Sequence, residues 1–260
     1  MPPTRDRDAI RAILSADPRW SLYALGDLAP GYFEHSEWHA ASDPDPALLL
    51  LYRAVTPPVL FAMGDPQAVA RLAEEIGEPA VYLHVQPETA QALAARYRFV
   101  ERKPMLRMFL DPARFRPETG ARVVRLGSAD ATRVETLYAD GRESGESPDF
   151  FFPSMLDRGV FFGVEEDGDL AAVAGTHLAV PEEGVAAIGN VYTRRDRRGR
   201  GLSGCLTSAV AAEILRLRIP VVGLNVSQRN SAAIRVYERL GFAAHCEFVE
   251  GPAVSFPYKF

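Results

Sequence analysis

The stretch 194–204 constrains this chain more than any other, because it combines three glycines with five arginines. It reads Arg-Arg-Asp-Arg-Arg-Gly-Arg-Gly-Leu-Ser-Gly, between a strand-like run that ends at Thr193 and a helical run that begins at Leu202. Glycine allows the backbone to fold tightly, so that successive N–H groups point into one small hollow that binds anions. The loop also precedes a helix, whose unpaired N–H groups and dipole favour a phosphate. We therefore predict a pyrophosphate-binding site; a solvated basic turn is the alternative interpretation.

The overall composition is that of an ordinary globular protein and not of a dedicated nucleic-acid binder. Of 260 residues, 47% are hydrophobic and 24% are charged, and the formal net charge is -5. A nucleic-acid-binding protein is usually basic overall, so we expect no nucleic-acid partner. The arginine cluster is a local feature on an acidic background.

The sequence gives no sign of a metal cluster, a disulfide framework or a targeting segment. The two cysteines, Cys205 and Cys246, are too few for either framework. Residues 1–8 are charged and lack the apolar core of a signal peptide. No stretch approaches the ~20 apolar residues that span a bilayer. We expect a cytoplasmic protein with no metal and no membrane association.

Periodicity predicts alternating strands and helices in both halves of the chain. In the first half we expect helices at 6–16, 67–76 and 88–97, and strands at 47–55, 59–63, 80–85 and 103–110. Residues 34–41 are short and mixed and receive no assignment. In the second half we expect a hairpin at 160–180, strands at 185–193 and 221–226, helices from 202 and over 231–240, and a last strand at 244–249.

The proline-containing, charged stretch 111–120 predicts a boundary between two domains, 1–115 and 116–260. A weak internal repeat supports two related units, since Leu83-His84-Val85, a helix and Phe99 resemble Leu224-Asn225-Val226, a helix and Phe242. The first half lacks the glycine loop. Its corresponding turn is Gly64-Asp65-Pro66, where an acid repels phosphate and a proline supplies no N–H. We therefore expect only the second half to bind the anion.

Three known glycine motifs fit the loop poorly. Gly199, Gly201 and Gly204 match G-x-G-x-x-G, but a dinucleotide fold needs an acid at the end of the next strand, where this sequence offers Asn225. A kinase loop lies in a hairpin, whereas a helix follows here. The Gly-Lys-Ser/Thr of a Walker motif is absent from the sequence.

A fourth pattern fits better. The segment 198–203, Arg-Gly-Arg-Gly-Leu-Ser, resembles the acyl-CoA-binding signature of the GNAT superfamily of N-acyltransferases, which is Gln or Arg, any, any, Gly, any, then Gly or Ala. Ser203 departs from the last position, but it is small and Gly204 follows. The flanks also match in the family's order: Gly189 to Thr193 before the loop, and Asn225-Val226, Asn230 to Ala233, Tyr237 and Leu240-Gly241-Phe242 after it.

The resemblance covers about residues 121–250 and implies the fold. It implies an α/β (α+β) chain of two GNAT-like units, each a mixed, mostly antiparallel twisted sheet flanked by helices. The layout is similar to that of two-unit members with a degenerate N-terminal unit, although the resemblance over residues 1–110 is weak. In the C-terminal unit it implies a V-shaped split between the strands 185–193 and 221–226.

The resemblance also implies that acetyl-CoA lies in this split. Backbone groups of Val191 and Thr193 would pair with the pantetheine arm, and N–H groups of the glycine loop would hold the pyrophosphate. The full set of cofactor-binding residues that we expect is Val191, Tyr192, Thr193, Arg198, Gly199, Arg200, Gly201, Leu202, Ser203, Gly204, Asn225, Asn230, Ala233 and Tyr237.

The implied reaction is direct attack of an amine on the thioester within a ternary complex. Tyr237 occupies the family's general-acid position, where it would serve the departing thiolate; a core tyrosine is the alternative. The candidates for the base are Glu143, Glu146 and Asn190 holding a water, and His177 is another, although a satisfied strand histidine is as good an interpretation. Phe150 to Phe152 either wall the acceptor pocket or belong to the core.

The leading hypothesis is thus an acetyl-CoA-dependent N-acetyltransferase that acts on a small-molecule or peptide amine. A non-catalytic acyl-CoA sensor or interaction protein is the alternative, because no single base stands out. The first half either shapes the acceptor pocket or forms a homodimer surface. The sequence does not identify the acceptor.

Overall fold

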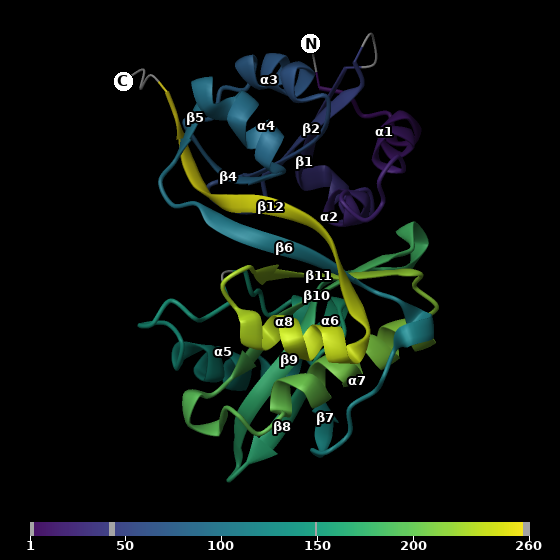
Figure 1. Ribbon diagram of the computed structural model, residues 1–260, viewed down its shortest axis with the longest axis vertical. Helices are drawn as coiled ribbons and strands as arrows, with labels where there is room; N and C mark the ends of the chain where they lie inside the picture. Colours follow the sequence, from purple (N-terminus) through teal and green to yellow (C-terminus); the bar gives the residue numbers. More distant parts are fainter. Residues whose placement is uncertain (1–2, 42–44, 149, 257–260) are drawn as a thin grey trace. The chain divides into compact units, whose positions relative to one another are not determined.

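The computed structural model describes residues 3–41, 45–148 and 150–256 (Figure 1). The chain divides into two compact units. Unit 1 comprises 1–107, 227–229 and 245–260, and unit 2 comprises 108–226 and 230–244. Each unit contains a mixed sheet flanked by helices, which confirms the predicted fold class. The domain limits 1–115 and 116–260 and the degenerate character of the first half stay predictions.

Unit 1 is built on a sheet of β1 (Ser36–Ala41), β2 (Ala47–Tyr52), β3 (Val59–Gly64) and β4 (Ala80–Val85). β2 is antiparallel to both β1 and β3, and β3 is parallel to β4, to which the helix α3 (Pro66–Glu74) connects it. The last part of β12 (Phe242–Ser255) adds to β4 antiparallel, and β5 (Tyr97–Phe99) pairs with β12 as well. α3 buries one apolar face on this sheet, with Val69 and Leu72 in the core.

The described part of the first half contains three further α-helices and one further strand. They are α1 (Arg7–Leu14), α2 (Leu22–Gly26), α4 (Pro87–Ala92) and β6 (Lys103–Leu110). The mixed stretch that received no assignment contains β1, whose backbone pairs along its whole length with β2. The predicted helix at 88–97 is partly wrong, since α4 stops at Ala92 and Tyr97 begins a strand.

Unit 2 is built on a five-stranded sheet in the order β7-β8-β9-β10-β11. Its strands are β7 (Val123–Arg125), β8 (Phe162–Glu166), β9 (Asp169–Val180), β10 (Val185–Thr193) and β11 (Val221–Ser227). β7 to β10 are antiparallel neighbours, and β8 and β9 form the predicted hairpin around Asp167 and Gly168, which both have positive φ. β11 runs parallel to β10.

Helices of unit 2 pack on this sheet and give it a core. α7 (Leu202–Arg216) connects β10 to β11 and packs on β7 to β10, while α5 (Ala131–Ala139) and α6 (Met155–Arg158) pack on β9. Tyr138 of α5, Phe161 and Tyr192 belong to one buried cluster. α8 (Ser231–Leu240) follows β11 and contacts α7 (Figure 1).

The strands β10 and β11 part from each other, as the V-shaped split predicts. Their paired positions run from Val185 and Val221 to Ile188 and Leu224 and stop there, although β10 continues to Thr193 and β11 to Ser227. The unpaired ends of two adjacent parallel strands expose backbone groups that a ligand can use in place of a strand.

Candidate active site

The glycine loop forms an open, uncapped helix N-terminus. Gly199 and Gly201 both have φ of 77°, a left-handed conformation that favours glycine, and a Cβ at either position would meet no atom within 4 Å. Gly201 stands at the N-cap position of α7, where no side chain accepts from the first N–H groups. The glycines are therefore required for backbone direction and not for space. The result is a cradle of N–H groups suited to a phosphate.

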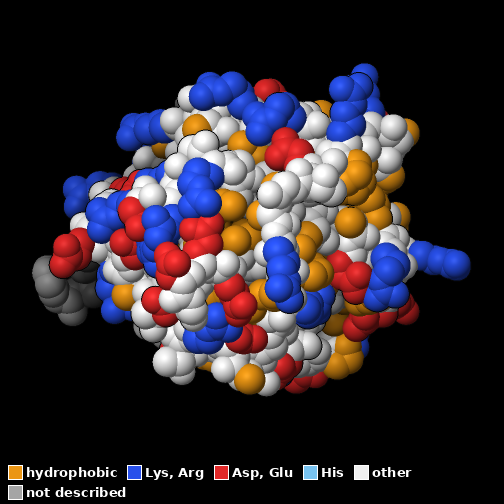
Figure 2. Space-filling model, turned by 90° about the horizontal axis from the view of Figure 1, so that it is seen from below, with side chains coloured by type: hydrophobic (Ala, Val, Ile, Leu, Met, Phe, Trp, Pro, Cys, Tyr) orange, Lys and Arg blue, Asp and Glu red, His pale blue; other side chains and the backbone are white. Residues whose placement is uncertain are grey.

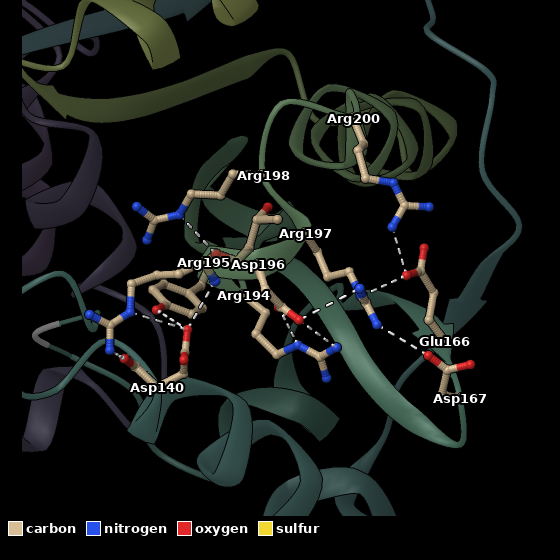
Figure 3. A network of polar contacts seen from close by, with 11 residues as sticks. Asp140, Glu166, Asp167, Arg194, Arg195, Asp196, Arg197, Arg198 and Arg200 are labelled. Carbon is tan, nitrogen blue, oxygen red and sulfur yellow. Dashed lines mark hydrogen bonds and ion pairs between the residues drawn. The ribbon is translucent and has the colours of Figure 1, made fainter.

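The five arginines of the loop are each paired with a carboxylate and do not form a free basic patch. Figure 3 shows the pairs of Arg194, Arg195, Arg197 and Arg200. Arg194 binds Asp196 within the loop, and Arg197 and Arg200 bind Glu166 of the β8–β9 hairpin at 3.0 and 2.8 Å. The remaining pairs are Arg195 with Asp140, Arg197 with Asp167 and Asp196, and Arg198 with Glu146. Figure 2 likewise shows a face on which basic and acidic side chains are interspersed. An anion at this loop would therefore be recognised first by backbone N–H groups.

The third glycine of the motif has a separate structural reason. A Cβ on Gly204 would lie 2.0 Å from Oε2 of Glu118, so glycine leaves room for this carboxylate against the first turn of α7. Glu118 also accepts from Nε of Arg239 at 3.2 Å. The cofactor role predicted for Gly204 stays a prediction, and the neighbouring Ser203 is half-buried.

The end of β10 leads directly to this cradle. Tyr192 is buried and its hydroxyl donates to Oδ2 of Asp140 at 2.8 Å, while Val191 and Thr193 on either side are half-buried. Nε of Arg198 donates to the carbonyl of Thr193 at 3.2 Å. The strand end and the glycine loop are thereby held together.

A β-bulge distorts β10 at Asn190. The register with β9 shifts between Gly189 and Tyr192, and Asn190 has a positive φ of 54°. Its carbonyl accepts from the buried hydroxyl of Tyr138 at 2.8 Å, and its Oδ1 is buried without a hydrogen-bond partner among the described residues. A bulge that redirects a strand is a common feature beside active sites.

Tyr237 lies in α8 with 8% of its surface exposed. Burial raises the pKa of its hydroxyl to about 12, so it holds its proton at neutral pH. Asn230 caps the same helix, since its Oδ1 accepts from the N–H of Ala233 at 3.0 Å. Asn225 follows the last paired position of β11 and is half-buried where the strands part.

The candidate bases differ sharply in their surroundings. Glu143 and Glu146 lie exposed in the turn after α5. Glu146 forms a two-point ion pair with Arg198, which holds its pKa below the ordinary value, whereas a general base near neutral pH needs a raised one. His177 lies at an irregularity of β9, where a Cβ on Gly189 would meet its ring at 2.4 Å. Phe151 packs on Tyr138 and Phe161, while Phe152 is exposed.

Sequence reasoning missed the residues that support the loop. Asp140 accepts from the backbone N–H of Arg195 at 3.0 Å and from Tyr192, and these two bonds hold its pKa below the ordinary value. Tyr138 holds the bulge. The available signal for Asp140 was a carboxylate at the start of the polar turn, but nothing in the sequence linked that turn to the loop 194–204.

No group of His, Cys, Asp and Glu within the described ranges could hold a metal ion. Among the helices of those ranges, none combines the length and hydropathy needed to cross a membrane.

Comparison with known proteins places this site in context. Residues 131–242 match the family described as "Acetyltransferase (GNAT) family". The mycothiol acetyltransferase of Acidimicrobium ferrooxidans is 33% identical over 119 residues, which are 45% of this chain and 35% of that protein. The chain spans less than two thirds of the length of the first curated relatives that it matches.

Solved structures resemble the whole chain. A putative acetyltransferase from the GNAT family of Novosphingobium aromaticivorans has a TM-score of 0.65 and 25% identity, over 92% of this chain and 99% of that one. A tandem GNAT protein from the clavulanic acid biosynthesis pathway has a TM-score of 0.59 and 16% identity, over 100% and 99%. The second likeness concerns the fold alone.

Proposed function

Residues 131–242 form a GNAT-family acetyltransferase domain, and on that premise we propose that the chain transfers an acetyl group from acetyl-CoA to an amine. The observation that carries this proposal is the open N-terminus of α7, which follows two left-handed glycines and lies beside the parted strands β10 and β11. A pyrophosphate fits such a cradle because its charge faces unpaired N–H groups.

The chain supplies a surface along which the donor can extend. N–H groups from Gly199 to Gly204 would hold the pyrophosphate, with Arg198 and Arg200 adding charge once their carboxylate partners give way. Backbone groups of Val191 and Thr193 would pair with the pantetheine arm, and Asn225 lies at the opposite side of the split. Ala233 and Asn230 at the start of α8 would complete the site.

Acetyl transfer to an amine requires one proton donor and one proton acceptor. The amine nitrogen attacks the thioester carbonyl, the carbon–sulfur bond breaks, and the amine loses a proton while the thiolate gains one. Tyr237 would donate to the thiolate, which its retained proton supports. Asn190, whose buried Oδ1 could hold a water, and Glu143 and Glu146 are the proposed groups on the acceptor side.

The acceptor is proposed as a small-molecule or peptide amine. Several relatives are named mycothiol acetyltransferase, so the acceptor of those proteins is a reasonable first member of an amine panel. A homodimer and a cytoplasmic location stay predictions.

The donor site is tested by two substitutions at one glycine. Gly201→Asp should weaken acetyl-CoA binding at least about tenfold, because it adds a carboxylate to the cradle as well as the strain of a left-handed residue. Gly201→Ala adds the strain alone and should weaken binding much less. Calorimetric titration of both variants and the wild type measures this. Unchanged affinity in Gly201→Asp would remove the proposed donor site.

A non-catalytic acyl-CoA-binding protein is the alternative. This alternative is favoured by one observation: Glu146, one of the proposed bases, forms an ion pair with Arg198. Thiol release from acetyl-CoA over the amine panel decides, since a sensor binds the donor without turnover.

A further inference from the structure

Glu146 and Arg198 form a two-point ion pair next to the glycine loop. Nη1 and Nη2 of Arg198 donate to Oε1 and Oε2 of Glu146 at 2.9 and 3.2 Å, so both carboxylate oxygens are engaged. Both side chains are 42% exposed. Arg198 directly precedes the first left-handed glycine, at the arginine position of the acyl-CoA signature. The carboxylate of Glu146 is therefore paired with a guanidinium next to the proposed phosphate cradle.

The turn that carries Glu146 presents this carboxylate in a defined position. The N–H groups of Glu146 and Ser147 both donate to the carbonyl of Gly141, at 2.9 and 3.2 Å. The hydroxyl of Ser144 donates to Oε2 of Glu146 at 2.8 Å. The glutamate is thus held by a folded turn, 141–148, and does not reach Arg198 as an isolated surface side chain.

The other partners of the loop differ from Glu146 in where they come from. Asp196 belongs to the loop itself, and Glu166 and Asp167 belong to the β8–β9 hairpin. Asp140 and Glu146 instead lie at the start of and within the turn after α5, which also carries Glu143, a proposed acceptor-side group. A ligand that competes for Arg198 would act on that segment.

We propose that Glu146 is an internal competitor of the donor: its carboxylate occupies Arg198 in the free protein, and a phosphate of CoA displaces it and releases the turn 141–148. This inference rests on the proposed function. It assigns Glu146 a regulatory contact in the donor site, in addition to the acceptor-side role proposed above. Donor binding then comes first, and it loosens the turn 141–148 on the acceptor side.

Competition of this kind has a size and a salt dependence. Exposed ion pairs are weak, so removal of the competing carboxylate should tighten CoA binding about two- to fivefold. The gain in affinity should be smaller at ~1 M salt, because screening weakens the ion pair in the wild type and so reduces the effect of removing it. A glutamate that acted only as a base would leave CoA affinity unchanged.

The experiment compares two matched variants. Glu146→Gln removes the ion pair and keeps the shape of the side chain. Glu143→Gln removes the same charge from the same turn, but Glu143 forms no ion pair within the described residues. Calorimetric titration with CoA should give tighter binding for Glu146→Gln and near wild-type binding for Glu143→Gln. Equal affinity in Glu146→Gln and wild type, or the same gain in both variants, overturns the proposal.

Hydrogen exchange tests the release of the turn. In the wild type, CoA should speed exchange of the amides of Glu146 and Ser147, whereas protection of these amides would overturn the release. The two levels of inference fail differently. A wild-type protein that does not bind CoA removes the proposed function together with the competitor, whereas binding without the Glu146 effect removes the competitor alone.

Discussion

At the level of single residues, Tyr237 has the environment that a proton donor to a thiolate requires. It is almost fully buried on α8, with its ring centroid 6.0 Å from that of Phe242. Burial disfavours the phenolate and raises the pKa to about 12. Because the folded pKa exceeds the ordinary value of 10, the protonated form prevails below pH 10 and is lost only as the pH rises toward 12.

Replacement of this hydroxyl should separate turnover from binding. Tyr237→Phe is expected to lower kcat at least about tenfold, or ~1.4 kcal/mol in the barrier, since general acid catalysis commonly contributes that much or more. The Kd for CoA should change less than about twofold, because the ring stays in place. Steady-state kinetics and calorimetry measure the two quantities.

The pH profile provides a second readout for the same residue. The wild type should show no loss of kcat from Tyr237 ionisation up to about pH 10. Equal turnover of Tyr237→Phe and wild type would return Tyr237 to the core interpretation and leave the thiolate without this donor.

At the level of elements, α5 fixes the bulge of β10. The bulge places Asn190 in a left-handed conformation, which costs a non-glycine residue energy unless its surroundings hold it. The hydroxyl of Tyr138 donates to the Asn190 carbonyl inside the protein, and both residues are at most 4% exposed. The helix therefore contributes to the shape of the strand that would bind the donor.

Two tyrosines of the same cluster allow a matched test of this contribution. Tyr138→Phe removes a donor from a buried carbonyl and should lower the free energy of unfolding by about 1–3 kcal/mol. Tyr192→Phe removes a donor from Asp140, which keeps the N–H of Arg195 and is partly exposed, so its cost should be below about 1 kcal/mol. Urea unfolding followed by circular dichroism compares them. A loss in Tyr138→Phe no larger than that in Tyr192→Phe would contradict the stabilising role of the hydrogen bond between Tyr138 and Asn190.

Element prediction from the sequence succeeded where the cause was local. α7 begins at Leu202, directly after the glycines, and ends at Arg216, shortly before Pro220. Element prediction failed where pairing with another strand determines the structure. β1 has a mixed sequence and is a strand because it pairs with β2. β12 extends past the predicted end at Val249, through Gly251 and Pro252, because β4 and β5 pair with it.

The candidate site likewise was predictable where the cause is local and not where it depends on residues distant in the sequence. Positive φ at Gly199 and Gly201 was predictable from glycine itself. The carboxylates that neutralise the arginines come from Glu146 and Glu166, which lie far from the loop in sequence, and a charge count along the chain does not find them.

At the level of the whole molecule, both units contain a strand, a helix and a parallel strand. The two helices differ at their N-termini, because one has a side-chain cap and the other does not. In unit 1 these elements are β3, α3 and β4, and Asp65 caps α3 by accepting from the N–H of Ala68 at 2.8 Å. Pro66 follows at the start of the helix, and a Cβ on Gly64 would lie 2.2 Å from the carbonyl oxygen of Pro46. In unit 2, α7 has no side-chain cap. Of these two helix N-termini, that of α3 carries a capping carboxylate and that of α7 does not.

This contrast predicts one CoA for each chain. The Asp65 carboxylate already accepts from the N–H of Ala68 at the start of α3, and its charge repels phosphate, whereas no side chain caps the N-terminus of α7. Calorimetry and native mass spectrometry of the full chain should both give a stoichiometry of about one. Gly201→Asp, which gives α7 the kind of carboxylate that α3 has, should remove that single event. Two CoA molecules per chain, or one that persists in Gly201→Asp with wild-type affinity, would mean that α3 or another element binds the donor, and the assignment of the site to the glycine loop would fall.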